Sequence, residues 1–180
     1  MKSIVLAFIF LGYSLLLTGQ TDNNFATRWL EFMSLQDSLP PKNYELIKEK
    51  LFTHITFEEV TNGNEFTKPV LIYFKAEGGV NCRKIEERVL NKIEIFERIT
   101  NDYLFLELVV NDATPLPEEQ KYRVGRRKIE TCGARYEDFQ IQKFGTNHQP
   151  YFVILDRNGK IKKSIGYRGF QAMLDFLKIK

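Results

Sequence analysis

Two cysteines, Cys82 and Cys132, are the residues of this chain with the most distinctive chemistry. A thiol at the start of a helix is stabilised as a thiolate, which can attack a disulfide, be oxidised or bind a metal ion. Thiol-disulfide exchange normally uses two cysteines separated by two residues, and the second resolves the mixed disulfide formed by the first. At this spacing the partner of Cys82 would be residue 79, which is a glycine. The exchange motif is therefore half complete.

The residues around Cys82 predict a strand, a helical crossover and a second strand. Residues 70–74 form an almost unbroken β-branched and aromatic run, typical of a strand buried on both faces. Residues 82–90 and then a segment capped by Asn91 and ending near Thr100 carry an apolar stripe at helical spacing. Residues 103–110 read as a second buried strand. A helical crossover between two strands predicts that they are parallel.

A polar stretch separates this unit from the next helix. Residues 111–133 include two prolines and show no period, so we predict a long excursion on the surface. Residues 134–144 then have apolar positions at helical spacing, and Gly145 is a typical helix stop. The predicted helix begins close to Cys132, at the same edge of the sheet as Cys82.

The C-terminal part predicts a hairpin that starts at a proline. Gln149 and Pro150 lead directly into the apolar run 151–155, an Asn-Gly turn follows, and residues 160–165 return as a strand. An amphipathic helix over residues 169–177 closes the chain. The order of elements predicts an α/β fold, a central mixed sheet flanked by helices on both faces.

Composition and charge limit the classes of function. The chain has 180 residues, 43% of them apolar, which suits one domain with its own core. The formal net charge is +3, and the basic triplet at residues 126–128 reads as a solvated loop. Without a basic face, we predict no nucleic-acid partner.

The N-terminus predicts export. Lys2, the apolar run of residues 4–17 and the small polar residues 18–22 have the order of a secretory signal that is cleaved near Gly19 or Gln20. The apolar run is shorter than the roughly 20 residues that a membrane-spanning helix needs, so we expect no stable membrane span after cleavage. The predicted location is periplasmic or otherwise extracytoplasmic, a compartment in which disulfides persist.

The predicted domain organisation has three parts. Residues 1–20 are the signal peptide, residues 21–65 are a helical N-terminal extension with helices near 24–36 and 42–53, and residues 66–180 are the main domain.

Three segments of the main domain carry a resemblance to a known family. Residues 68–74, 78–87 and 143–151 together resemble the thioredoxin-fold family, and more narrowly the C-terminal thioredoxin-like domain of DsbD-type thiol:disulfide interchange proteins. The resemblance covers roughly residues 66–178. It implies a thioredoxin-like α/β fold, thiol-disulfide exchange as the activity of the superfamily, and no cofactor.

The resemblance also implies roles for individual residues. Gly79 occupies the position of the first, nucleophilic cysteine, and Cys82 matches the second, more sheltered one. Pro150 matches the cis proline that faces the active site, so Gly79, Gln149 and Pro150 are the substrate-binding positions. The implied partners are protein thiols and disulfides or extended polypeptide, with any membrane redox partner a separate chain.

Four interpretations of Cys82 stay open. It can be a buried small apolar residue, a monothiol nucleophile, the partner of Cys132 in a disulfide, or a member of a metal site or an intermolecular disulfide. The two cysteines lack zinc-ligand spacing with His54 and His148, so we predict no metal. His148 is expected to be a solvated or hydrogen-bonded surface residue.

Two functions from different classes follow from these interpretations. The first is an exported protein of the thiol-disulfide exchange superfamily that lacks ordinary dithiol activity because of Gly79, with Cys82, alone or with Cys132, as its catalytic candidate. The alternative is a redox-inactive thioredoxin-like domain that binds extended protein segments or a partner protein.

Overall fold

The computed structural model describes residues 55–63 and 65–178, which belong to one compact unit. The predicted signal peptide and the predicted helices near 24–36 and 42–53 lie outside the described residues. Within the described part, no helix is both long and apolar enough to cross a membrane.

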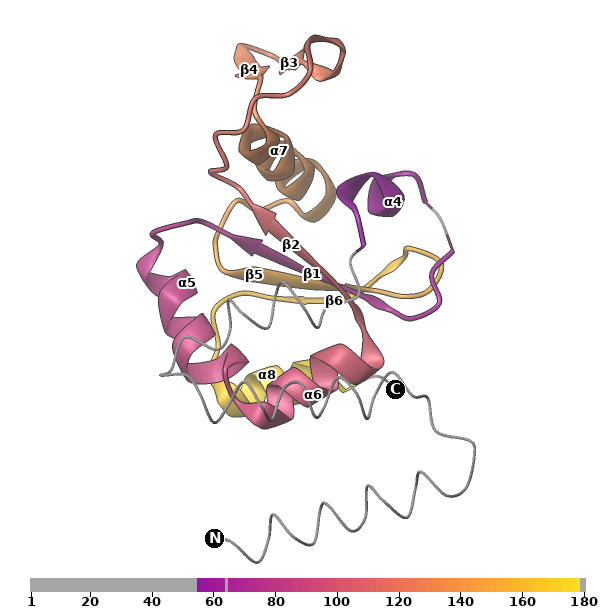
Figure 1. The fold of residues 1–180 in the computed structure, drawn as a ribbon, viewed down its shortest axis with the longest axis vertical. Helices are drawn as coiled ribbons and strands as arrows, with labels where there is room; N and C mark the ends of the chain where they lie inside the picture. Colours follow the sequence, from indigo (N-terminus) through magenta and orange to yellow (C-terminus); the bar gives the residue numbers. More distant parts are fainter. Residues whose placement is uncertain (1–54, 64, 179–180) are drawn as a thin grey trace, which may run out of the picture. The chain divides into compact units, whose positions relative to one another are not determined.

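The centre of the fold is a four-stranded mixed sheet with the order β2-β1-β5-β6 (Figure 1). Strand β1 (Val70–Lys75) runs parallel to β2 (Leu104–Val109) and antiparallel to β5 (Tyr151–Leu155). Strand β6 (Ile161–Ile165) pairs antiparallel with β5. All six residues of β1 are buried, as its apolar run predicts for a central strand. The predicted strands, their directions and the mixed sheet are confirmed.

Helices cover both faces of this sheet (Figure 1). One face packs against α4 (Phe57–Thr61) and α7 (Cys132–Phe144), where an aromatic cluster closes the core. The other face lies under α5 (Val80–Ile85), the π-helical turn η1 (Glu86–Leu90), α6 (Ile93–Asp102) and α8 (Phe170–Phe176). Gly145 ends α7 in the left-handed conformation, with a φ of 68°, as predicted.

The crossover differs from the prediction at two helix starts. The first helix begins at Val80 and not at Cys82, so Cys82 lies inside the first turn. Asn91 is not the N-cap of α6: it has helical dihedral angles and ends η1, and its backbone N–H donates to the carbonyl of Glu86. Lys92, which is extended, precedes the first residue of α6. Asn91 is therefore the C-cap of η1. The N-cap of α6 is Lys92, whose side chain makes no capping hydrogen bond.

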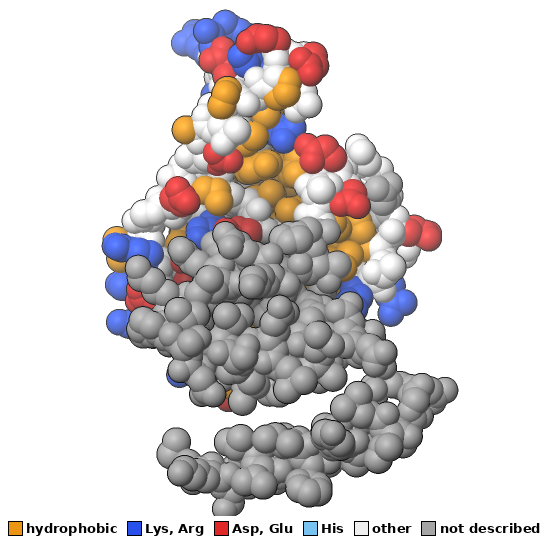
Figure 2. All heavy atoms as spheres, in the orientation of Figure 1, with side chains coloured by type: hydrophobic (Ala, Val, Ile, Leu, Met, Phe, Trp, Pro, Cys, Tyr) orange, Lys and Arg blue, Asp and Glu red, His pale blue; other side chains and the backbone are white. Residues whose placement is uncertain are grey.

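The stretch 111–133 contains regular structure that its lack of period did not predict. It holds the 3-10 turn η2 (Glu118–Gln120) and the short hairpin β3 (Tyr122–Val124) and β4 (Arg127–Ile129). Basic side chains gather at this end of the molecule in Figure 2, and Arg126 and Lys128 are exposed.

The hairpin is held against α7 by Arg127. Its guanidinium donates to Asp138 at 2.8 Å and to Glu137 at 3.0 Å, and the Tyr122 hydroxyl donates to Asp138 at 2.9 Å. These contacts with α7 stabilise a hairpin whose strands have only three residues each. Arg127 is thus a structural ion-pair residue, unlike the solvated loop residue that the basic triplet suggested.

Candidate functional site

Cys82 lies beneath the loop that joins β1 to α5. Only 2% of its surface is exposed, and the backbone N–H of Ala76 donates to its sulfur at 3.5 Å. The loop turns at Gly78, whose φ of 75° favours glycine, and Gly79 then caps the helix. The Cys82 thiol is therefore buried inside the molecule, and Gly79, the N-cap of α5, precedes it at the helix start.

Gly79 faces the Cys82 sulfur directly. A Cβ atom built on Gly79 would lie 3.4 Å from that sulfur and 3.0 Å from the carbonyl oxygen of Ala76. The dihedral angles of Gly79, φ −64° and ψ 121°, are accessible to any residue. The backbone therefore does not require glycine here, and the position has the direction that a paired cysteine needs.

Cys132 lies at the start of another helix near the same sheet edge. Asn111, just beyond β2, exchanges two hydrogen bonds with the backbone of Glu77, at 2.8 and 3.1 Å. The Cys132 N–H donates to the carbonyl of Thr114, three residues further along, at 2.8 Å. Both cysteine-bearing segments are thus tied to the chain that leaves β2, and the structure holds both cysteines as free thiols.

A buried polar cluster next to Cys82 was missed by the sequence reasoning. Lys75, 6% exposed, places its ammonium 2.6 Å from a carboxylate oxygen of Glu86 and 3.9 Å from one of Glu107. The Tyr73 hydroxyl donates to the same Glu86 oxygen at 3.0 Å. The available signal was a lysine that extends an apolar strand, together with a glutamate one helical turn after Cys82.

The charge state of this cluster follows from burial and its near neighbours. Burial, and then the charges of Glu86 and Cys82, raise the pKa of Tyr73 far above its ordinary value. Burial by itself lowers the pKa of Lys75, but the hydrogen bond to Glu86 and the charges of Glu107, Glu86 and Cys82 outweigh it, so that the pKa of Lys75 is raised. At neutral pH a neutral tyrosine and a buried ammonium therefore lie beside the thiol.

The Gln149–Pro150 peptide bond is cis, as the resemblance implied. Pro150 is buried and leads into β5, where Tyr151 is paired with Phe74 near the end of β1. The loop before it is therefore at the same sheet edge as the Cys82 loop. His148 is exposed, as predicted, and its N–H donates to the Thr146 hydroxyl at 3.3 Å.

Gln140 of α7 makes hydrogen bonds with the loop that precedes Pro150, a role that the sequence did not predict. Its side chain is fully buried; its amide N–H donates to the carbonyl of His148 at 3.0 Å, and its oxygen accepts from the Gln149 amide at 2.9 Å. A buried amide that meets two partners orients both of them. Gln140 therefore positions the residues that precede Pro150.

Replacing Gln140 by methionine is expected to destabilise the protein by about 2 kcal/mol, because the His148 carbonyl loses its buried donor. Urea unfolding of Gln140→Met measures the change. The exposed Gln142 of the same helix supplies a matched control, and Gln142→Met should change the stability by no more than about 0.5 kcal/mol. Equal effects of the two substitutions would show that the buried amide adds nothing.

Two exposed apolar side chains lie at this edge. Val80, 55% exposed, follows Gly79, and Tyr167, 40% exposed, follows Gly166. A Cβ atom built on Gly166 would lie 3.9 Å from the carbonyl of Pro150, so Tyr167 emerges beside the proline loop. In the described residues no group of three histidine, cysteine, aspartate or glutamate side chains could hold a metal ion.

The chain is similar to known proteins over most of the described residues. Residues 58–179 match the family model of a thioredoxin-like domain. The solved DsbH oxidoreductase is 16% identical with a TM-score of 0.51, over 70% of this chain and 81% of that chain. A disulphide isomerase from Xylella fastidiosa Temecula1 is 13% identical with a TM-score of 0.44, over 70% and 94% of the two chains. The reduced DsbD C-terminal domain from Neisseria meningitidis is 14% identical with a TM-score of 0.39, over 74% and 86%. No curated protein matches this chain.

Proposed function

Because the chain belongs to the thioredoxin-like domain family, we propose that it is an exported thioredoxin-like protein that does not carry out dithiol exchange and instead binds extended segments of other proteins. The observation that carries the proposal is the burial of Cys82, 2% exposed, behind Gly79. Export rests on the signal-like N-terminal segment.

The absence of dithiol exchange follows from what the reaction needs. An exposed thiolate must attack the partner disulfide, and a second thiol must then release the product. Gly79 offers no sulfur at the start of the helix, and Cys82 is covered by the Ala76 loop. A disulfide of a folded partner protein would not reach the Cys82 sulfur without movement of that loop.

The proposal of peptide binding is based on the surface around Gly79. The exposed side chains of Val80 and Tyr167 offer apolar contact near the Pro150 loop. An extended polypeptide supplies main-chain hydrogen bonds together with apolar side chains, which suits such an edge. Gln149 and Pro150 are the residues that we propose contact the bound chain, with Gly79 leaving room for it.

A second candidate function is monothiol exchange by Cys82. It is favoured by the backbone N–H of Ala76, which donates to the Cys82 sulfur at 3.5 Å and so offers this sulfur a hydrogen-bond donor. In this reaction the Cys82 thiolate forms a bond to one sulfur of a partner disulfide, and the other sulfur leaves as a thiolate. The partners would then be protein disulfides, including those of a separate membrane redox protein.

Insulin reduction by dithiothreitol separates the two functions. We expect the wild-type protein to leave the rate within about twofold of dithiothreitol alone, since no exposed thiol attacks insulin. Cys82→Ser should behave in the same way. A rate increase, or a trapped mixed disulfide, that occurs with the wild type and is lost in Cys82→Ser would instead establish the monothiol reaction.

Binding is tested with a fluorescent, carboxymethylated insulin B chain, which has no free thiol. We expect saturable binding that Cys82→Ser leaves unchanged and that Val80→Asp weakens by about tenfold, as a charge disrupts the apolar contact. Ile161 is equally exposed, at 53%, and lies in the edge strand β6. Ile161→Asp is therefore the matched control, and equal loss in both variants would contradict a site at this edge.

A further inference from the structure

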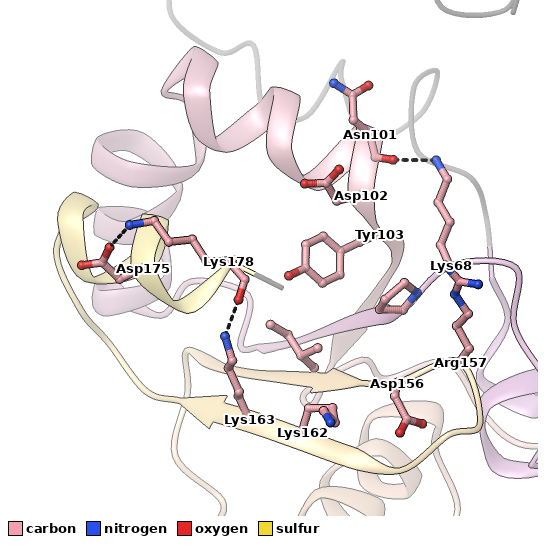
Figure 3. A pocket seen from close by; sticks show the side chains of 12 residues that line it. Lys68, Asn101, Asp102, Tyr103, Asp156, Arg157, Lys162, Lys163, Asp175 and Lys178 are labelled. Atoms are coloured by element: carbon pink, nitrogen blue, oxygen red, sulfur yellow. Dashed lines mark hydrogen bonds and ion pairs between the residues drawn. The ribbon is translucent and has the colours of Figure 1, made fainter. Parts of the chain in front are cut away.

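A hollow with a volume of about 890 Å³ lies at the sheet edge opposite Cys82 (Figure 3). It is formed where β1 begins, where α6 ends, at the turn between β5 and β6, and at the end of α8. Its apolar lining residues are Pro69, Tyr103 and Ile154. This volume is in the range of small-molecule sites in proteins.

Charged side chains surround this apolar floor. Five basic and three acidic residues line the hollow, which gives the lining a net charge of +2 at neutral pH. Several of these groups already have partners within the protein. The Lys68 ammonium donates to the carbonyl of Asn101 at 2.8 Å, and the Lys163 ammonium donates to the carbonyl of Lys178 (Figure 3). The Lys163 ammonium also donates to the carbonyl of Phe176 at 3.2 Å.

The acidic residues are also engaged. Asp175 accepts from the Lys178 ammonium at 2.6 Å, and Asp102 is 3.5 Å from the Arg98 guanidinium. Asp156 accepts from the backbone N–H groups of the turn that follows it, at 2.9 Å each. The internal carboxylates are therefore occupied by other donors.

Arg157 and Lys162 differ from these residues. Both line the hollow, and neither side chain makes a hydrogen bond or an ion pair with any residue of the described ranges 55–63 and 65–178, although the Arg157 carbonyl accepts from the backbone N–H of Phe66 at 2.8 Å. Arg157 lies in the turn between β5 and β6, and Lys162 lies in β6, so a single hairpin carries both cations. Their charges are available to a ligand in the hollow.

A bulge explains why Lys162 lines the hollow together with its neighbour. Ile154 is paired with Lys163 and Leu155 with Ile161, so the ladder shifts register and Lys162 is an extra residue. Consecutive side chains of a regular strand point to opposite faces, but a bulge re-aims one of them. Lys162 and Lys163 consequently both contribute to the same lining.

We propose that this hollow binds a small organic anion, whose phosphate or carboxylate group is held by Arg157 and Lys162 while its apolar part rests on Pro69, Tyr103 and Ile154. A guanidinium and an ammonium together match the oxygens of either group through charge-assisted hydrogen bonds. This site is distinct from the Cys82 edge and does not depend on peptide binding there.

Calorimetric titration of the full-length protein tests the site with phenyl phosphate, benzoate and inorganic phosphate, at constant ionic strength. We expect saturable binding of phenyl phosphate or benzoate, and weaker binding of inorganic phosphate, which lacks the apolar part. The first two probes distinguish a phosphate ligand from a carboxylate ligand. Absence of saturable binding for both organic probes would overturn the proposal.

Two double variants locate the binding. Arg157→Gln with Lys162→Gln should weaken the better organic probe by about tenfold, because it loses two charge-assisted contacts. Lys128→Gln with Lys160→Gln removes the same charge from exposed residues outside the hollow, and should change the affinity by less than about twofold. Equal weakening in both would show an effect of net charge alone and would overturn the site. All four positions are exposed, and unchanged thermal unfolding verifies that each variant is folded.

Discussion

Gly79→Cys is expected to turn the protein into an insulin reductase, with a rate at least about a hundredfold above the wild-type contribution. The introduced Cβ atom would lie 3.4 Å from the Cys82 sulfur, at a backbone conformation open to any residue. The new thiol would lie at the N-cap of α5, where the helix dipole favours its thiolate. Turbidity of insulin reduced by dithiothreitol measures the rate.

The gain depends on both sulfurs acting in sequence. The introduced thiolate attacks an insulin disulfide, forms a mixed disulfide and releases one insulin thiolate. The Cys82 thiolate then attacks the introduced sulfur, releases the second insulin thiolate and leaves an intramolecular disulfide, which dithiothreitol reduces. Resolution from a neighbouring sulfur is fast because it occurs within one molecule.

Two variants control this experiment. Gly79→Ser adds a side chain of similar size without a thiol, so it reports the cost of the 3.0 Å approach to the Ala76 carbonyl without any redox chemistry. Gly79→Cys combined with Cys82→Ser keeps the attacking thiol and removes the resolving one. A Gly79→Cys protein that folds but reduces insulin no faster than Gly79→Ser would show that more than the missing sulfur prevents exchange.

The sheet was predictable because its strands are continuous apolar runs. Residues 70–74 and 151–155 are apolar on both faces of a strand, so both faces are buried when these strands lie inside the sheet. The helical crossover after the first run makes the next strand its parallel neighbour. The proline before the second run, and the glycine that ends α7, are local signals that the structure bears out.

The remaining parts depend on contacts between distant residues. Arg127 holds the β3–β4 hairpin through Asp138, and Gln140 holds the Pro150 loop, yet neither partner is within one helical turn in sequence. No local period reports such contacts. The buried pair of Lys75 and Glu86 is a similar case, because each residue by itself reads as an exposed charge.

The Lys75 cluster also gives a dependence of stability on pH. The pKa values of Tyr73 and Lys75 are both raised in the folded protein, so the folded state holds these protons more tightly than the unfolded state does. The stabilisation is therefore complete below the unfolded pKa values of about 10, and it is lost as the pH rises beyond them. Urea unfolding between neutral pH and the alkaline range should show this decline, and Tyr73→Phe should make it smaller.

Lys75→Met is expected to destabilise the protein by about 3 kcal/mol, because it leaves the Glu86 carboxylate buried without its cation. Urea unfolding at neutral pH measures the loss. Lys84→Met removes the same charge from an exposed position of α5 and should change the stability by no more than about 0.5 kcal/mol. Adding Glu86→Gln to Lys75→Met removes the uncompensated charge and keeps an acceptor for the Tyr73 hydroxyl, so the double variant should be more stable than Lys75→Met alone. Glu86→Gln alone completes the cycle, and a double variant whose loss equals the sum of the two single losses would show that Lys75 and Glu86 are uncoupled.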